Sequence, residues 1–284
     1  MRAWFAPGKM VLAGEYAVLD GGPALVAAVG HGVACEFSPG AFEILTPDGD
    51  NRFVAPALEE APPGRYRFRS HPGLDLPGKP GFGGSAAACV VACLAAGRPA
   101  LDAREIHARV QGGGSGVDVL ASALGGMLRV EGGKASSVEL AMPVVVYSGR
   151  SASTGPRVQQ YLGWSGREAF LRDSEEAVAL LLREPIAGAR AALAALQRMS
   201  EQAGIDYLSP GLARIVELAR AHGGAAKPSG AGGGDVAVAW LPDEEAERAF
   251  RAACEAQGLP VIEAPLAGPA GALASPDPGV SSSA

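Results

Sequence analysis

Residues 78–88 read GKPGFGGSAAA, a glycine-rich bend that passes directly into an alanine-rich stretch. Glycine tolerates positive φ angles and lets a ligand come close to the main chain, whereas residues 86–96 favour a helix. A helix that begins near Ser85 directs its unpaired N–H groups and the positive end of its dipole at the bend, which favours a bound anion. The junction therefore predicts either a tight turn before a core helix or a phosphate-binding loop.

The composition is that of a folded protein, with 284 residues, 48% of them hydrophobic, and a net charge of -6. This length allows two lobes of ordinary size. The negative charge argues against nucleic acid as a partner, and the apolar run at 86–96 is too short to cross a membrane. Lys9 and Glu15 interrupt any apolar core of an export signal, so we expect a cytoplasmic protein. Its four cysteines show no paired spacing and are expected to be buried thiols.

Lysine is rare, with only four among 24 basic residues, and three of the four lie in or beside glycine-bearing loops. Lys9 closes APGK, Lys79 opens KPGFGG and Lys227 opens KPSGAGGG. A lysine ammonium acts as a movable point charge for phosphate. This distribution favours a phosphate-bearing small molecule as the ligand.

The first half of the chain alternates short strand patterns with three helical patterns. Strands are expected at 2–5, 10–13, 24–28, 32–37, 42–46, 127–130, 137–140 and 144–147, with one edge strand within 56–80. Helices are expected at 85–96, 102–110 (with Asp102 as N-cap) and 117–124. These elements define a first lobe at 1–147.

After Tyr147 the chain changes to longer helical patterns, at 156–162, 167–182, 185–202 and 210–221. A strand, a helix and a strand are then expected at 235–240, 244–257 and 260–263. We assign 148–265 to a second lobe. Residues 266–284 are rich in Ala, Pro, Gly and Ser and are expected to be a disordered tail.

Two common nucleotide motifs are disfavoured. Residues 78–85 carry Gly84 and Ser85 where a Walker A loop requires Lys and then Ser or Thr. The GAGGGD segment at 230–235 lacks the dinucleotide fingerprint and precedes an expected strand, where that fold needs a helix. A P-loop ATPase and an NAD-binding protein are therefore disfavoured. Asp118 lies near the start of an expected helix, where the local sequence favours a simple interaction with the helix dipole over a catalytic role beside Lys9.

Four ordered segments, at 6–29, 79–91, 112–126 and 227–240, resemble the motifs of the GHMP-type small-molecule kinases, which include galactokinase, homoserine kinase, mevalonate kinase and phosphomevalonate kinase. GEYAVL at 14–19, GSGVDVLAS at 114–122 and SGAGGGD at 229–235 are most similar to phosphomevalonate kinases; mevalonate kinases tend to carry histidine where Tyr16 stands. The resemblance implies an α/β (α+β) fold of two lobes, the first ribosomal-S5-like and the second ferredoxin-like. It also implies a mevalonate-pathway enzyme of isoprenoid biosynthesis, which transfers the γ-phosphoryl group of ATP to (R)-5-phosphomevalonate.

The resemblance further implies the site residues. Lys9 and Asp118 would be catalytic and face the transferred group, and Ser85 would also bind Mg²⁺. The residues expected around the ATP phosphates are Lys79, Gly81, Phe82, Gly83, Gly84, Ser85 and Ala86. Those expected at the substrate are Tyr16, Ser115, Arg150, Thr154, Ser229, Gly230, Ala231 and Gly232.

The chain departs from the family pattern at three places. Phe82 and Gly84 replace a leucine and a serine of the usual GLGSS loop, and His107 stands where mevalonate kinases carry a metal-binding glutamate. The region 53–77, where part of the adenine pocket would lie, is short. Mevalonate kinase or another small-alcohol kinase, mevalonate-diphosphate decarboxylase and a non-catalytic paralogue stay open as alternatives. Monomer and homodimer are both compatible with the sequence.

Overall fold

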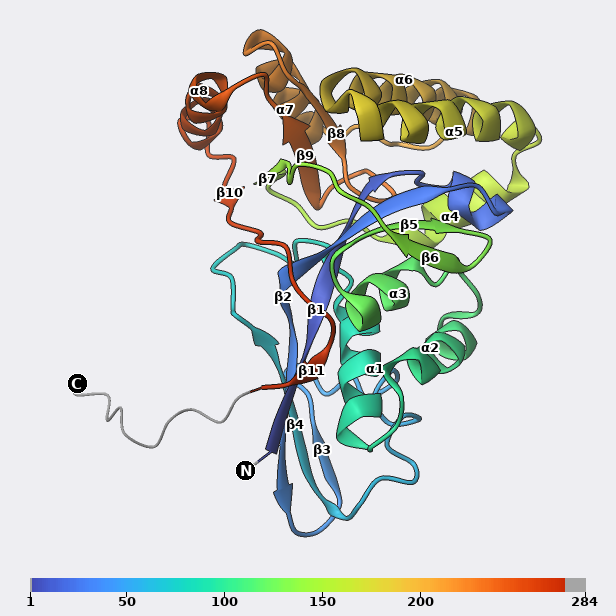
Figure 1. Cartoon of the computed structure of the whole chain (residues 1–284), viewed down its shortest axis with the longest axis vertical. Helices are drawn as coiled ribbons and strands as arrows, with labels where there is room; N and C mark the ends of the chain where they lie inside the picture. Colours follow the sequence, from blue (N-terminus) through green and yellow to red (C-terminus); the bar gives the residue numbers. More distant parts are fainter. Residues whose placement is uncertain (1, 274–284) are drawn as a thin grey trace.

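The computed structural model describes residues 2–273, which form two β-sheets flanked by helices (Figure 1). The first sheet has seven strands, and its main path runs β11-β1-β2-β4-β3, with β5 and β6 branching from β2. The second sheet has four strands in the order β10-β7-β9-β8. The mixed α/β architecture predicted from the sequence is confirmed.

Two long antiparallel strands form the centre of the first sheet: β1 (Arg2–Ala13) and β2 (Ala24–Pro39). Register shifts between Pro7 and Gly8 and between Val11 and Ala13 interrupt their pairing, and the sequence analysis interprets each of these strands as two shorter ones. The remaining strands are β3 (Glu43–Leu45), β4 (Gly64–His71), β5 (Met127–Glu131), β6 (Lys134–Ser137) and β11 (Gly271–Ala272). On β4 the burial alternates because Tyr66 and Phe68 face the core while the arginines between them face solvent.

Three helices, α1 (Gly84–Ala95), α2 (Ala103–Gln111) and α3 (Val117–Leu124), cover one face of this sheet (Figure 1). Short 3₁₀ turns lie at Ala17–Asp20 (η1) and Ala100–Asp102 (η2). The central helix α1 is almost entirely buried and consists of small residues, so it packs close to β1 and β2. Asp102 precedes α2 as predicted, but its side chain makes no cap hydrogen bond and pairs instead with Arg98.

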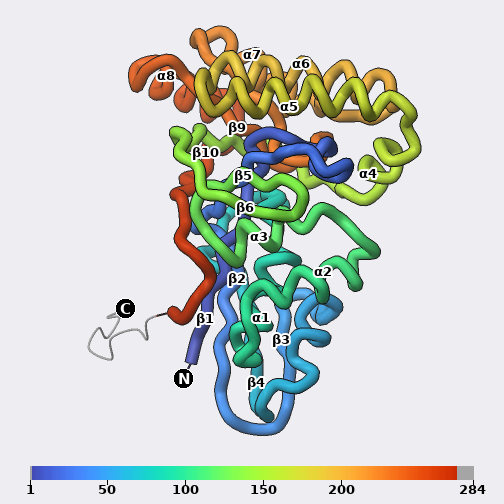
Figure 2. Tube along the Cα trace, turned by 45° about the vertical axis from the view of Figure 1, so that its right-hand side comes forward, coloured from blue at the N-terminus to red at the C-terminus, as the bar shows by residue number. Residues whose placement is uncertain are grey.

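The second sheet contains β7 (Val144–Tyr147), β8 (Ala225–Pro228), β9 (Val236–Trp240) and β10 (Val261–Ile262). One face packs against α7 (Pro210–Ala221) and α8 (Glu244–Glu255). The other packs against α5 (Arg167–Arg183), α6 (Pro185–Ala203) and the inner ends of β1 and β2. Helix α4 (Thr154–Gly163) follows β7 in the chain, and its Tyr161 hydroxyl donates to Asp20 of η1. The trace in Figure 2 shows α5 and α6 side by side at the far end of the molecule.

Three expectations need correction. Strand β7, which the predicted boundary after residue 147 assigns to the first lobe, pairs with β9 and β10 in the second sheet, so the sheets divide the chain before Val144. Strand β8 is absent from the expected elements because AAKP lacks β-branched and aromatic residues. The strand expected at 137–140 lies at Lys134–Ser137, where it completes a hairpin with β5.

The expected disordered tail is also wrong for residues 266–273. This segment returns along the first sheet: β11 pairs with Trp4 and Phe5, Leu266 bridges Val29, and the Leu273 N–H donates to the Ala3 carbonyl. Free N–H and C=O groups on the edge strand β1 explain why a segment of low hydrophobicity is ordered here. The rest of the expected tail, 274–284, lies outside the described residues.

Candidate active site

A pocket lies between the two sheets, where β1, the ends of α2 and α3, and the loop before β9 meet. Nine of the residues predicted at the site line it: Lys9, Tyr16, Gly81, Ser115, Asp118, Thr154, Ser229, Gly230 and Ala231. These side chains come from segments more than 200 residues apart. The structure therefore brings the four motif segments of the sequence to one place.

Lys9 and Asp118 face each other in this pocket, with Lys9 Nζ 3.5 Å from Asp118 Oδ1. Lys9 projects from β1, whereas Asp118 lies in the first turn of α3. The lysine side chain is only 11% exposed and the carboxylate 36% exposed, so a small ligand has direct access mainly to the carboxylate side of the pair. An ammonium held in this way is positioned to stabilise negative charge in the pocket.

The loop at 78–85, the first glycine loop, packs directly on this pair. The Lys9 N–H donates to the Phe82 carbonyl at 2.9 Å. A Cβ atom at Gly83 would lie 3.1 Å from two carbons of Lys9 and 3.6 Å from Asp118 Oδ2. Gly83 has φ +69 and precedes α1, so its conformation and the space beside Lys9 both favour glycine. Gly84 then begins α1, whose first N–H groups are directed at the loop.

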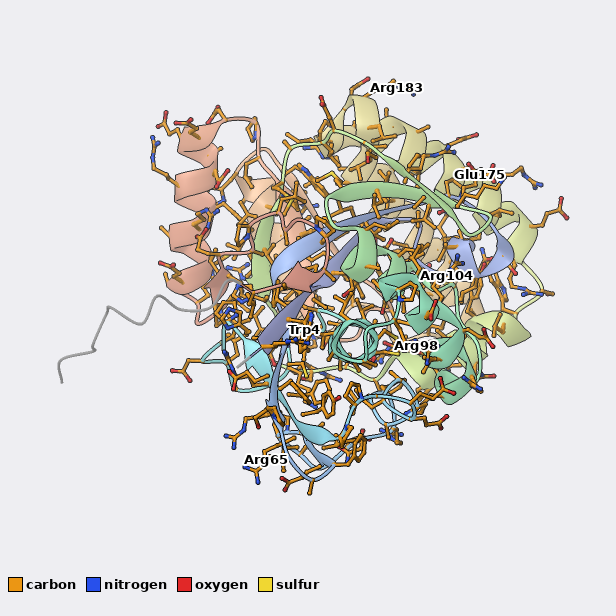
Figure 3. The ribbon with its side chains drawn as sticks, turned by 60° about the horizontal axis from the view of Figure 1, so that its bottom comes forward. Trp4, Arg65, Arg98, Arg104, Glu175 and Arg183 are labelled. Atoms are coloured by element: carbon orange, nitrogen blue, oxygen red, sulfur yellow. The ribbon has the colours of Figure 1, made fainter. Side chains whose placement is uncertain are left out.

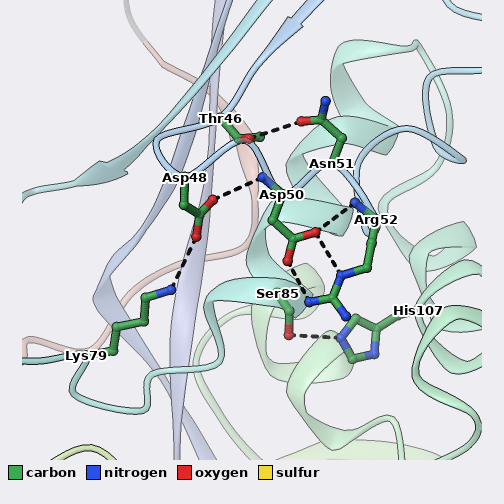
Figure 4. A network of polar contacts seen from close by, with 8 residues as sticks. All are labelled: Thr46, Asp48, Asp50, Asn51, Arg52, Lys79, Ser85 and His107. Carbon is green, nitrogen blue, oxygen red and sulfur yellow. Dashed lines mark hydrogen bonds and ion pairs between the residues drawn. The ribbon is translucent and has the colours of Figure 1, made fainter.

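The other residues of this loop have different surroundings. Phe82 is buried and stacks on His31, with ring centroids 5.8 Å apart, so it anchors the loop rather than facing a ligand. Ala86 is fully buried in the core beneath the loop. Ser85 Oγ lies 3.2 Å from His107 Nε2 (Figure 4). Burial lowers the pKa of His107, although the nearby charge of Asp118 acts in the opposite direction.

The structure does not bring Lys79 to the pocket. Its side chain is 89% exposed and its ammonium lies 3.5 Å from Asp48 Oδ2, on the outer side of the loop (Figure 4). Arg150 is also exposed and does not line the pocket; its backbone carbonyl accepts from the Asp235 N–H and from the Ser148 hydroxyl. Gly232 packs against Tyr207, behind the pocket.

The loop at 229–235, the second glycine loop, is held to the first sheet by three hydrogen bonds. The Val11 N–H donates to Ser229 Oγ at 3.0 Å, and the Tyr16 hydroxyl donates to the Ala231 carbonyl at 2.7 Å. The Gly230 N–H donates to Glu15 Oε1 at 3.4 Å. Because Val11 is two residues from Lys9, one strand positions both the ammonium and this loop.

Behind this loop lies a buried ion pair that the sequence analysis does not assign to the site. Lys227 is completely buried, and its ammonium contacts the Glu15 carboxylate and donates to the Pro228 carbonyl at 2.7 Å. Burial lowers the pKa of Lys227, and Glu15 opposes this shift. The only sequence signal for Glu15 is its position in GEYAVL, directly before the predicted site residue Tyr16.

Asp235 also enters the pocket and is absent from the sequence-predicted set. Its backbone has φ +59, its Oδ1 accepts from the Ala152 N–H at 3.0 Å, and a Cβ atom at Gly81 would lie 2.4 Å from its Oδ2. Burial raises the pKa of its carboxyl group, whereas the Ala152 hydrogen bond and the charges of Lys9 and Arg157 lower it. The Asp235 carboxylate of the second lobe therefore contacts the first glycine loop.

Comparisons with known proteins agree with this geometry. Residues 177–258 match the family described as GHMP kinases C terminal. A segment of 53 residues, 19% of this chain, is 49% identical to the phosphomevalonate kinase of Streptomyces sp. (strain CL190); this match spans 14% of that kinase's own length.

Two solved structures share the fold over nearly the whole chain. The Lin0012 protein from Listeria innocua has a TM-score of 0.85 at 21% identity, covering 96% of this chain and 99% of that one. Streptococcus pneumoniae phosphomevalonate kinase, in complex with phosphomevalonate and AMPPNP, has a TM-score of 0.77 at 19% identity, covering 94% of this chain and 100% of that one. The second lobe therefore contains a segment that matches the C-terminal domain of the GHMP kinases, and nearly the whole chain shares the fold of a phosphomevalonate kinase, in line with the sequence resemblance.

Proposed function

We propose that this protein is a kinase that transfers the γ-phosphoryl group of ATP to (R)-5-phosphomevalonate, giving 5-diphosphomevalonate and ADP. The observation that carries the proposal is the Lys9–Asp118 pair, which lies against the first glycine loop on one side and opens into the pocket on the other. The segment that is 49% identical to a phosphomevalonate kinase favours this acceptor over other small alcohols.

In this reaction an oxygen of the acceptor phosphate attacks the γ-phosphorus of ATP, and the bond from that phosphorus to the β-bridging oxygen breaks. A phosphomonoester has a second pKa of about 6, so the attacking oxygen is largely ionised at neutral pH. Asp118 therefore has little need to act as a base. Its contact with Lys9 holds the ammonium between the two phosphate groups, where it offsets their mutual repulsion.

The site also fits a magnesium ion of the kind that phosphoryl transfer uses. Within residues 2–273 no cluster of three or more His, Cys, Asp or Glu side chains forms a metal cage. Magnesium in kinases is held largely by phosphate oxygens and water, with one or two protein ligands. The Ser85 hydroxyl would supply such a ligand, and the ion would supply charge neutralisation. Burial lowers the pKa of His107 beside Ser85, which favours the neutral imidazole, and an imidazole nitrogen is a poor ligand for this ion.

The acceptor pocket is expected to use the second glycine loop together with Tyr16, Ser115 and Thr154. Of the substrate residues predicted from sequence, Arg150 and Gly232 do not line the pocket, so we assign them no contact. The role of Lys79 beside the triphosphate would require its side chain to leave Asp48. The described residues contain no helix that is both long and apolar enough to span a membrane.

A coupled assay of ADP release with phosphomevalonate, mevalonate, galactose and homoserine tests the proposal. Phosphomevalonate should give the highest kcat/KM. The Asp118→Asn variant separates the alternatives, because a hydroxyl nucleophile needs a general base and an ionised phosphate does not. Faster turnover of mevalonate, together with its complete loss in Asp118→Asn, would instead indicate a mevalonate kinase.

A further inference from the structure

Arg104 lines the active-site pocket, yet within residues 2–273 its guanidinium group has no ion pair and no side-chain hydrogen bond within normal distance. It projects from α2, and Figure 3 labels it where α2 and α3 meet. His107, Ala108 and Gln111 follow at spacings of three, four and seven residues, so the four residues share one helix face, and all of them line the pocket. A partly exposed arginine on a pocket-facing stripe has its donors available to a ligand.

The charges around the pocket show what Arg104 contributes. Asp118 is paired with Lys9, and Glu15 is paired with the buried Lys227. Asp235 adds a further carboxylate without an ion pair among the described residues. The charged side chains that line the pocket are therefore three carboxylates, those of Glu15, Asp118 and Asp235, and two cations, Lys9 and Arg104. The charge of Arg157 acts on Asp235 from outside this lining. Arg104 gives the pocket a second cation beside Lys9, where phosphoryl transfer requires two anionic reactants to be held.

Two glycine-containing turns pack close to the Arg104 guanidinium. A Cβ atom at Gly116 would lie 3.6 Å from Arg104 Nε, and one at Gly133 would lie 3.2 Å from Nη2. Both glycines have positive φ, +71 and +75. The arginine side chain therefore lies between two backbone turns that carry no side chains, next to the loop that leads into α3 and Asp118.

We propose that Arg104 binds a phosphate group of one of the two reactants, as a second cation beside Lys9. This inference rests on the proposed phosphoryl transfer and assigns a phosphate contact to a residue that the family resemblance does not imply. A guanidinium group has a planar fork of five N–H donors that matches phosphate geometry in a bidentate contact. The phosphate belongs either to the nucleotide or to the acceptor, and binding measurements separate these two sources.

The experiment measures binding of AMPPNP and of phosphomevalonate, each alone, by isothermal titration calorimetry. The variants are Arg104→Met, Arg104→Lys and the matched control Arg109→Met. Arg109 lies on the same helix, is exposed and is not part of the pocket lining. Thermal unfolding of each variant checks that it is folded, and Arg104→Lys supplies a conservative variant should Arg104→Met fold poorly.

Arg104→Met should weaken binding of one ligand by roughly 10- to 100-fold, the range of a lost charge-assisted hydrogen bond. The ligand that loses affinity identifies the source of the phosphate. Arg104→Lys should recover part of the loss, and Arg109→Met should bind both ligands within about twofold of the parent chain. Affinities of Arg104→Met for both ligands within about twofold of the parent would overturn the proposal.

The same binding measurements distinguish a wrong Arg104 assignment from a wrong proposed function. If the parent chain binds AMPPNP but not phosphomevalonate, the proposed acceptor is wrong, and the Arg104 assignment is then judged on AMPPNP and on inorganic pyrophosphate. A selective loss of either ligand in Arg104→Met supports the assignment. Unchanged binding of both contradicts it.

Discussion

The first glycine loop, residues 78–85, leads into a helix, whereas the second glycine loop, residues 229–235, leads into a strand. The glycines of the two loops also have different structural roles. In the first loop Gly81 and Gly83 leave space for charged side chains, Asp235 and Lys9 respectively. In the second loop Gly232 and Gly233 let the backbone pass beneath Tyr207 and Arg157. The first loop keeps main-chain N–H groups free for a ligand, and the second is fixed by bonds to the rest of the protein.

This difference suggests a division of labour within the proposed site. The first loop and α1 offer a ready anion-binding surface with few side-chain constraints. The second loop takes its position from β1, through Val11, and from η1, through Tyr16. Since Lys9 also lies on β1, one strand positions both the proposed catalytic lysine and the loop proposed to bind the acceptor.

Lys9→Met tests most strongly whether the first loop serves phosphoryl transfer. Removing a cation that stabilises the transferred group should lower kcat by about 10³- to 10⁵-fold. Folding should change little, because Lys9 is only loosely paired with Asp118 at 3.5 Å. Steady-state kinetics together with thermal unfolding measures both. A variant with more than a tenth of the parent kcat would remove Lys9 from the mechanism.

Lys227→Met tests whether the second loop depends on its buried ion pair. The change leaves the Glu15 carboxylate buried without its partner, so we expect a loss of about 3–5 kcal/mol in the free energy of unfolding. The double variant Glu15→Gln/Lys227→Met removes both charges and should regain most of this loss in urea titrations. Equal stability of the single and double variants would mean that the buried Glu15 carboxylate costs no stability when its partner is removed.

Gly81→Ala and Gly84→Ala form a matched pair within the first loop. Gly81 has φ +77 and no room for a Cβ atom beside Asp235, so alanine should cost about 1–2 kcal/mol. Gly84 is in the helix with open space around it, so alanine there should stabilise the protein by about 0.5–1 kcal/mol. Urea unfolding of the two variants should therefore give shifts of opposite sign; shifts of the same sign would contradict the comparison.

Ser229→Ala removes the side chain that accepts from the Val11 N–H and should cost about 1 kcal/mol of stability. Because this bond positions the second loop, the KM for phosphomevalonate should rise while the KM for ATP stays nearly constant. An equal rise in both values would show that the bond supports the fold in general rather than the acceptor loop.

The smallest expected effect is a pH dependence from Asp235, whose carboxyl pKa is raised by burial above its ordinary value of 3.8. A raised pKa means that the folded state holds the proton more tightly, so this group's contribution to stability is present below pH 3.8 and is lost as the pH rises through the raised value. The free energy of unfolding of the parent minus that of Asp235→Asn should therefore fall across this range and then level off. A difference that is constant with pH, measured by urea titration, would exclude the effect.

Much of the fold follows from local patterns in the sequence. Helices α3 and α7 and strand β7 have the expected bounds because apolar periodicity and flanking glycine or proline mark their ends. Strand β8 and the ordered segment at 266–273 escape such reasoning, since both depend on pairing with distant strands. Local composition does not predict a strand whose hydrogen-bonding partner lies far away in the sequence.

The site shows the same limit. Residues within glycine-bearing motifs, such as Lys9, Asp118 and Ser229, meet as the family resemblance implies. Arg104 faces the pocket because of its position on one side of α2, which no motif records, although its spacing from His107 is a usable signal. Lys227 does open a glycine motif, but it is buried against Glu15 and does not line the pocket. Lys79 shows the converse, because a lysine in a glycine-rich segment is directed away from the pocket.

The most direct test of the proposed reaction is ³¹P NMR of a mixture of the protein, ATP, Mg²⁺ and (R)-5-phosphomevalonate. The phosphomonoester signal should be replaced by the two coupled doublets of a diphosphate monoester as ADP forms, and Lys9→Met should show no such change over the same time. Persistence of the phosphomonoester signal with the parent protein, while ATP is consumed with mevalonate or another alcohol, would contradict it.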